Sequence, residues 1–375
     1  KKEIESILNA GFLHKTDTRL APELTKELYS DRNRVSVTRL EKFASCAYAH
    51  FLSYGLRLSD REEYGFEALD LGNIAHKSLE TFSKKADAQK MKWQEIPEAL
   101  RDEMIDESVE ESVIDYGNTV LFSSARNEYM ITRIKRLIRT SVWALTKQIE
   151  KGDFLPSGYE MQFGSGKIDR IDTCFDNDCV YVKVTDYKTG MKSFDITALY
   201  HGLQMQLPVY LNAALDVEQR KHPHKTIVPA GIFYYRIQDP IVSEEKTQDA
   251  VERSILKELK QDGLVNGDDM VISHLEKELS GNSLLFPIGR NKDGSLSKTS
   301  HALPEELFRL VLLLRNEKKS RSKTECMTEK FPPLRMRWEK LQDVITVRTE
   351  IYVGSIRVLK DVVTAGWRDI LQTMR

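Results

Sequence analysis

Apolar positions recur at helical spacing up to about residue 151 and form strand-like runs in much of the chain that follows. The spacing predicts helices over residues 36–43, 70–85, 95–118 and 125–151. In the first of these, Glu41 follows Thr38 by three residues, which is the pattern of a capping box, so Thr38 is the predicted N-cap. Residues 1–34 are polar and predict a linker with a short helix.

Strand character dominates from about residue 157 to residue 189, and residues 166–190 read as two strands joined by a hairpin. The elements predicted downstream are a helix over 203–215, a buried strand over 226–236 and a charged helix over 245–262. Pro208 is expected to distort the first of these helices. The order of helices, antiparallel hairpin, helix, strand and helix predicts an α/β sandwich with a helical insert.

The composition is typical of a globular protein in water, with 41% hydrophobic and 30% charged residues among 375. The 56 basic and 57 acidic residues give a net charge of −1, so bulk charge does not favour nucleic-acid binding, although a local basic groove would suffice. No apolar run approaches the ~18–20 residues of a membrane span, so no membrane partner is expected.

Features of the chain that bear on its location agree with a reducing cytoplasm. The first residues lack the apolar segment of a signal peptide. Four cysteines in so long a chain do not make a disulfide scaffold. The chain does not begin with Met, from which we expect a fragment or a processed piece.

The hairpin carries residues suited to metal-assisted hydrolysis. Asp169 lies in Gly-Lys-Ile-Asp-Arg-Ile-Asp on the first strand, and Asp186 and Lys188 lie in Asp-Tyr-Lys-Thr-Gly on the second. Two carboxylates can hold a hard cation such as Mg²⁺, and a lysine beside them can orient a water. Asp172 is a weaker candidate, because three residues of strand place it on the face opposite Asp169. A nuclease is therefore the first hypothesis.

Two flanking helices add polar side chains to this set. His76 follows Gly-Asn-Ile-Ala in the helix predicted over 70–85, and Gln206 and Tyr210 share a helix face at i, i+4. Taken singly, each motif is more often structural: a satisfied helical histidine, an Asp169–Arg170 ion pair, a surface ion pair on an edge strand, or packing at a core boundary. Their order along the chain is much more specific.

This ordered set resembles the RecB-type nucleases of the PD-(D/E)xK superfamily, and within them the C-terminal nuclease region of AddB-type subunits. The residues from Ser36 to Cys46 resemble the segment that enters that domain, and Ile232–Ile241 also resembles it. The resemblance covers about residues 35–310 and implies a restriction-endonuclease-like core sheet flanked by helices, with a helical insert at about 90–152.

The resemblance also implies roles for individual residues. The metal ligands would be His76, Asp169, Asp186 and the backbone carbonyl of Tyr187, around Mg²⁺ or, alternatively, Mn²⁺. Lys188 would position the attacking water, and Gln206 and Tyr210 would contact DNA or brace the site. The implied partners are DNA and an AddA-like helicase–nuclease subunit, in a complex that repairs double-strand breaks.

The chain departs from the family where an iron–sulfur cluster would be bound. AddB-type nucleases hold such a cluster with four cysteines, of which Cys46 matches the first, while the C-terminal Cys-x-x-Cys-x5-Cys group is missing. Cluster ligation needs these thiolates, so no 4Fe-4S cluster is predicted. From about residue 311 to 375 the sequence is a divergent, basic tail, expected to be disordered, whose origin is either a frame-shifted reading or natural divergence.

Several alternatives stay open at this point. The chain could be a catalytically silent DNA-binding or scaffold fragment, or a stand-alone RecB-like exonuclease of the CRISPR-associated kind. Cys174 and Cys179 near the hairpin tip are interpreted as a chance pairing rather than a redox or metal pair. The basic residues Arg133, Lys135, Arg136 and Arg139 are interpreted as a solvated face, with a phosphate-contacting stripe as the alternative.

Overall fold

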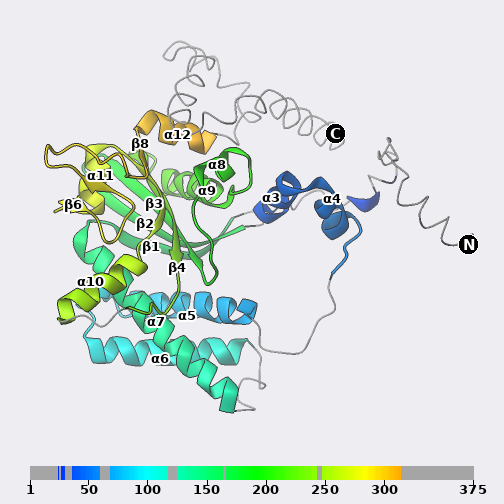
Figure 1. Ribbon diagram of the computed structural model, residues 1–375, viewed down its shortest axis with the longest axis horizontal. Coiled ribbons are helices and arrows are strands. Elements are labelled where there is room, and N and C mark those ends of the chain that lie inside the picture. The colour runs from blue at the N-terminus through cyan, green and yellow to red at the C-terminus, as the bar shows by residue number, and fades with distance from the viewer. Residues whose placement is uncertain are drawn as a thin grey trace, which may run out of the picture.

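The computed structural model describes residues 24, 27–29, 36–59, 68–116, 125–163, 166–242 and 247–313 (Figure 1). Most of the predicted N-terminal linker, and the predicted tail from residue 314 onward, lie outside the described residues.

A mixed sheet forms the centre of the fold, with strands in the order β1-β2-β3-β4-β5-β8. Its strands are β1 (Leu155–Phe163), β2 (Gly166–Asp176), β3 (Cys179–Lys188), β4 (Thr226–Arg236), β5 (Asp262–Asn266) and β8 (Ala302–Leu303). The β1–β2, β2–β3 and β4–β5 pairs are antiparallel, and the β3–β4 and β5–β8 pairs are parallel. A separate two-stranded sheet consists of β6 (Gly281–Asn282) and β7 (Gly289–Arg290). The antiparallel β2–β3 pair is the predicted hairpin.

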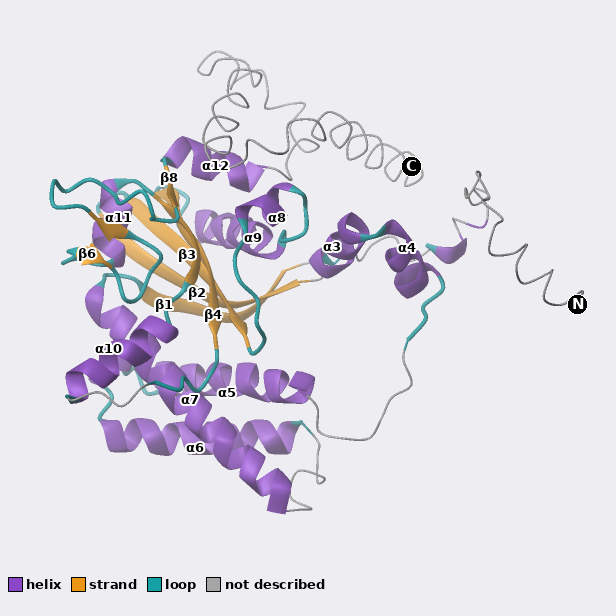
Figure 2. Cartoon of the chain, in the orientation of Figure 1, coloured by secondary structure: helices purple, strands orange, loops and turns teal. Residues whose placement is uncertain are grey.

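Helices cover both faces of the large sheet (Figure 2). One face carries α5 (Ala68–Ala88), the short η2 (Trp93–Glu95), α6 (Glu98–Asp115) and α7 (Ala125–Lys151). The opposite face carries α8 (Ile196–Tyr200), α9 (Gln206–Lys221) and α12 (Glu305–Leu313). The remaining helices are α3 (Val37–Ser45), α4 (Ala47–His50), η1 (Phe51–Gly55), α10 (Gln248–Glu258) and α11 (Asp269–Leu275). This architecture confirms the predicted α/β fold with flanking helices, and α6 and α7 lie within the range expected of the insert.

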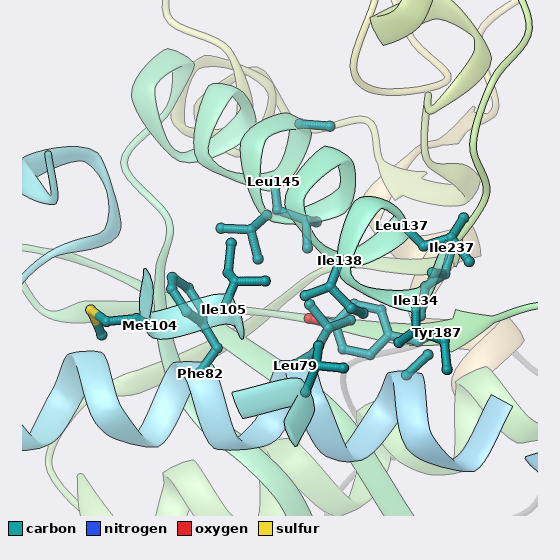
Figure 3. Packing of buried hydrophobic residues seen from close by; sticks show 14 of the residues in the cluster. Leu79, Phe82, Met104, Ile105, Ile134, Leu137, Ile138, Leu145, Tyr187 and Ile237 are labelled. Carbon is teal, nitrogen blue, oxygen red and sulfur yellow. The ribbon is translucent and has the colours of Figure 1, made fainter. Parts of the chain in front are cut away.

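The core beneath α5, α6 and α7 is shown in Figure 3. Leu79 and Phe82 of α5 pack against Ile105 of α6 and Ile138 of α7, and all four are almost completely buried. Tyr187 at the end of β3 belongs to the same cluster. Because neighbouring strand residues face opposite ways, Tyr187 anchors this end of β3 in the helical core while its neighbours Asp186 and Lys188 point toward the other face.

Two local predictions at helix starts were wrong. Ser36, not Thr38, is the N-cap of α3, because Ser36 has an extended backbone and its Oγ accepts a hydrogen bond from the N–H of Arg39. Pro208 does not distort α9, because the helix begins at Gln206 and not at residue 203. Pro208 therefore lies in the first turn, where its missing N–H has no helical partner to lose.

The predicted start of the tail at residue 311 was also wrong by a few residues. Val311 and Leu312 belong to α12 and are buried in the core that α9 and α12 share. The carbonyl of Leu312 accepts a 2.8 Å hydrogen bond from Asn212 Nδ2 on α9. The family-like fold therefore continues through Leu313.

Candidate active site

Three elements bring Asp169, His76 and Tyr187 together. Asp169 lies near the start of β2, which is adjacent to the end of β3 because the two strands are antiparallel. The backbone N–H of Tyr187 donates a 2.7 Å hydrogen bond to Asp169 Oδ2. His76 of α5 places Nδ1 3.3 Å from the same oxygen, and its ring meets the Tyr187 ring edge-on at 5.8 Å. The carboxylate is thus held from two sides.

Glu160 of β1 completes a group that sequence reasoning missed. Its carboxylate, that of Asp169 and the imidazole of His76 offer ligand atoms that all lie within 4.8 Å of one another. Glu160 has φ of 48°, an uncommon value for a residue other than glycine, and its carboxylate pairs with Lys167. The available signal was its register, because the pairings Tyr159↔Arg170 and Met161↔Ile168 place Glu160 opposite Asp169.

Asp186 lies beside this group and is held by Lys188 and α9. It is 1% exposed and forms an ion pair with Lys188. Gln206 Nε2 donates hydrogen bonds to Asp186 Oδ1 at 3.0 Å and to Tyr210 Oη at 2.8 Å. The predicted shared face of Gln206 and Tyr210 is therefore present, and it faces the second acidic residue of the site.

The three carboxyl groups and the imidazole influence one another's ionisation. Burial and the negative charge of Asp169 raise the pKa of Asp186 to about 7, against the opposing influence of Lys188. Burial and Asp169 also raise the pKa of Glu160. Burial disfavours the charged form of His76, but the hydrogen bond and charge of Asp169 outweigh it and raise the pKa of His76. The site therefore concentrates negative charge that a cation would neutralise.

These residues fit a divalent metal ion. Two carboxylates and an imidazole are hard and borderline donors of the kind that bind such ions, and the mutual repulsion of the carboxylates would be relieved by a bound cation. They border a cavity of about 570 Å³, lined also by Lys77, Lys167 and Lys188. The opening is wide enough to admit an anionic substrate beside the carboxylates, with ammonium groups on its wall.

The comparison with known families decides the fold family. A model of the PD-(D/E)XK nuclease superfamily matches residues 34–284. The chain belongs to the PD-(D/E)XK nuclease superfamily. The membership inferred from the motifs is therefore confirmed.

Several bacterial proteins that are named as subunits of an ATP-dependent helicase/deoxyribonuclease are similar to this superfamily member. The protein of Alkaliphilus metalliredigens is 38% identical over 325 residues, which are 80% of the chain and 28% of the relative. That of Lachnoclostridium phytofermentans is 38% identical over 320 residues, or 81% and 28%. That of Clostridioides difficile is 34% identical over 337 residues, or 83% and 29%. The chain thus spans under a third of the length of these relatives.

Asp172 of this nuclease fold is not near the cavity group. It is buried and receives a 2.6 Å hydrogen bond from Arg170 Nε, and it also pairs with Lys183. The alternative that Asp169 forms an ion pair with Arg170 was wrong, because Arg170 turns to the other face with Asp172. Arg170 also lies over the Trp93 ring at 4.9 Å.

The cysteines of the nuclease fold are dispersed among the described residues. Cys46 is exposed, caps α4 by accepting from the N–H of Ala49, and is in none of the metal-capable groups found there. Cys174 is buried and opposes Tyr181, not Cys179, across the β2–β3 pair. This register supports the interpretation that the two hairpin cysteines are not a functional pair.

A second group of possible ligand atoms consists of Asp153, Cys174 and His274. Asp153 already accepts from Lys277 Nζ at 2.6 Å and lies 3.0 Å from His274 Nδ1. Burial raises the pKa of the Cys174 thiol to about 12, which keeps it protonated. The group is therefore an ion-pair network with a buried thiol.

The basic residues of α7 mostly pair with acids. Lys135 lies 2.7 Å from Glu110 and Arg139 lies 2.6 Å from Asp106, both on α6. Arg136 pairs with Asp239. These pairs account for three of the four cations without a phosphate-contacting stripe. Across the described parts of the chain, no helix is both long and apolar enough to cross a membrane.

Proposed function

We propose that this chain is the nuclease module of an AddAB-type helicase–nuclease and hydrolyses DNA phosphodiester bonds with Mg²⁺, or alternatively Mn²⁺. The observation that carries the proposal is the convergence of His76, Glu160 and Asp169 within 4.8 Å of one another, beside Asp186 and Lys188. The relatives are named as deoxyribonuclease subunits, which supports the same conclusion.

Each residue of the site has a role in this proposal. His76, Glu160 and Asp169 would hold the metal, with Asp186 and the carbonyl of Tyr187 as the further ligands inferred from the family motifs. A divalent cation bound there supplies Lewis-acid activation of a phosphate oxygen and a more acidic water. The net reaction forms a bond between water oxygen and phosphorus and breaks one P–O ester bond.

The remaining polar residues position the reactants. Lys188 would orient the attacking water and stabilise the charge that develops on the phosphate oxygens. Its ammonium is anchored by Asp186 and lies 5.6 Å from the centre of the Tyr234 ring. Gln206 would keep Asp186 oriented through its 3.0 Å hydrogen bond, and Tyr210 would brace Gln206.

The wider context follows from the relatives and belongs to the proposal. The partner would be an AddA-like subunit, the substrate would be DNA exposed by helicase action, and the location would be the cytoplasm. The absence of a 4Fe-4S cluster stays a prediction, since it depends on the missing cysteine group of the sequence.

The test is cleavage of labelled single-stranded DNA with Mg²⁺ by the unaltered chain, Asp186→Ala and Lys188→Ala. Lys147→Ala serves as a surface control, because Lys147 pairs only with Glu150 on α7 in the described structure. Cleavage that the two site variants lose and the control keeps supports the nuclease. Equal cleavage by all four points to a contaminant. Intact DNA binding without cleavage would instead favour the scaffold function.

A further inference from the structure

Glu41 of α3 makes a long-range contact with the start of α9. Its Oε1 accepts hydrogen bonds from the backbone N–H groups of Met205 at 2.6 Å and Gln206 at 3.0 Å. Met205 provides no side-chain cap for α9, so the Glu41 carboxylate takes that position. A carboxylate at a helix N-terminus satisfies N–H groups that have no partner within the helix and complements the positive end of its dipole.

The residue capped by Glu41 is also the residue that contacts the catalytic carboxylate. The backbone of Gln206 is held by Glu41, while its side chain donates to Asp186 at 3.0 Å and Tyr210 at 2.8 Å. The path from Glu41 to Asp186 thus passes through one residue and two hydrogen bonds. A displacement of the first turn of α9 would move the Gln206 amide away from Asp186.

Charge around this path also ties Glu41 to the site. Lys192 and Lys188 lie over the same Tyr234 ring, at 4.9 Å and 5.6 Å from its centre. Burial lowers the pKa of Lys192, and the charges of Glu41 and Asp186 oppose that effect while Lys188 adds to it. Glu41 therefore lies on one side of a pair of ammonium groups whose other acidic neighbour is Asp186.

The rest of α3 does not explain why it is held in this position. None of its nine residues, all of them described, is buried. Val37 makes a partly buried contact with the core under α9. With so little apolar burial to fix the helix, a hydrogen-bonded carboxylate has a large share in placing α3 against α9.

We propose that Glu41 is a positioning residue of the active site, which fixes Gln206 and, through it, the orientation of Asp186. The inference deepens the proposed nuclease function and rests on it. It makes α3, the helix that ends one residue before Cys46, a part of the catalytic support. Any event that shifts α3 would then be felt at Asp186.

The variants that test it are Glu41→Ala, Glu41→Gln, Gln206→Ala and the double variant Glu41→Ala/Gln206→Ala. Glutamine keeps a carbonyl oxygen that can accept both N–H groups, so Glu41→Gln should recover most of what Glu41→Ala loses. Asp268→Ala is the matched control, because Asp268 caps α11 by accepting from Met270 N–H at 2.9 Å and does not contact the site.

A first measurement needs no catalysis. Amide hydrogen exchange at Met205 and Gln206, and the NMR signals of the Gln206 side-chain amide, report the two links separately. In Glu41→Ala the backbone amides should exchange faster and the side-chain signals should shift, while Glu41→Gln and the control stay near the unaltered chain. Unchanged Gln206 side-chain signals in Glu41→Ala would overturn the proposal, whether or not the protein cleaves DNA.

A second measurement uses DNA cleavage. Loss of an outer residue that orients a metal-site ligand costs roughly 10- to 100-fold in metal affinity or activity. Glu41→Ala and Gln206→Ala should each lower kcat or raise the half-saturating Mg²⁺ concentration on that scale, with KM for DNA little changed. The double variant should be no worse than Gln206→Ala. Fully multiplied losses in the double variant would show that Glu41 acts independently of Gln206 and would refute the proposal.

Discussion

The backbone N–H of Tyr187 donates to the carboxylate of Asp169 across the β2–β3 pair, at 2.7 Å. Tyr187 itself is anchored in the helical core beneath α5 and α7. The orientation of Asp169 is therefore set by packing on the face of the sheet opposite Asp186, which gives the site a rigid support before any metal binds.

Asp169→Asn should lower the pKa of His76. The burial of His76 favours its neutral form, and Asp169 is the main group that offsets this, so removing the charge leaves burial dominant. NMR titration of the metal-free protein measures the change. Asp115→Asn, which also changes an acid on the cavity wall, is the control. An unchanged pKa of His76 in Asp169→Asn would show that the two groups do not interact.

Glu160→Gln should weaken metal binding although Glu160 lies outside the recognised motifs. The substitution keeps the size of the side chain but removes one negative charge from the group with His76 and Asp169. We expect Mn²⁺ affinity, measured by calorimetry without DNA, to fall by at least about tenfold, the lower end of the range for outer ligand partners. Glu80→Gln, an acid on the same cavity wall that pairs with Lys77 and Lys84, should leave it unchanged. Equal affinities for both variants would remove Glu160 from the site.

The parts of the site that sequence could predict are those encoded locally. Asp186 and Lys188 are two residues apart on one strand, so their shared face follows from the alternation of a strand. His76 and Asp169 could be connected only through the order of motifs. Glu160 is a single acid without a motif, and its place depends on the register of β1 on β2.

Contacts between distant segments were beyond the sequence. Glu41 is 165 residues from Gln206, and nothing in either segment alone predicts that they bond. The capping prediction failed for a related reason. Ser36 and Thr38 are both hydroxyl residues suited to an N-cap, and Glu41 seemed to select Thr38 through a capping box, whereas its carboxylate is engaged by α9.

The pKa of Asp186 predicts how the stability of the metal-free protein depends on pH. Its value of about 7 lies above the roughly 3.9 of an unfolded aspartate. The folded state therefore keeps a proton that the unfolded state releases, so this contribution to the free energy of unfolding is present below about pH 4 and is lost as the pH rises toward 7. Between pH 4 and 7 the Tm of the unaltered chain should decline relative to that of Asp186→Asn. Parallel Tm curves for the two proteins would contradict the raised pKa.

Asp172→Asn should destabilise the fold without touching the cavity group. It leaves Arg170 and Lys183 buried without their shared counter-charge, and breaking a buried ion pair from one side costs about 3–5 kcal/mol. Urea unfolding at pH 7 measures this, with Asp176→Asn, a more exposed acid on the same strand, expected to cost under about 1 kcal/mol.

The same variant has a pH dependence of opposite sign to that of Asp186. Burial raises the pKa of Asp172, but the charges of Arg170 and Lys183 outweigh burial and lower it. Its contribution is therefore present above the unfolded value of about 3.9 and is lost as the pH falls through the lower folded value. The difference in unfolding free energy between the unaltered chain and Asp172→Asn should stay constant from pH 7 to about 5 and shrink in stronger acid. A difference that grows on acidification would mean that Asp172 is protonated in the folded protein at neutral pH.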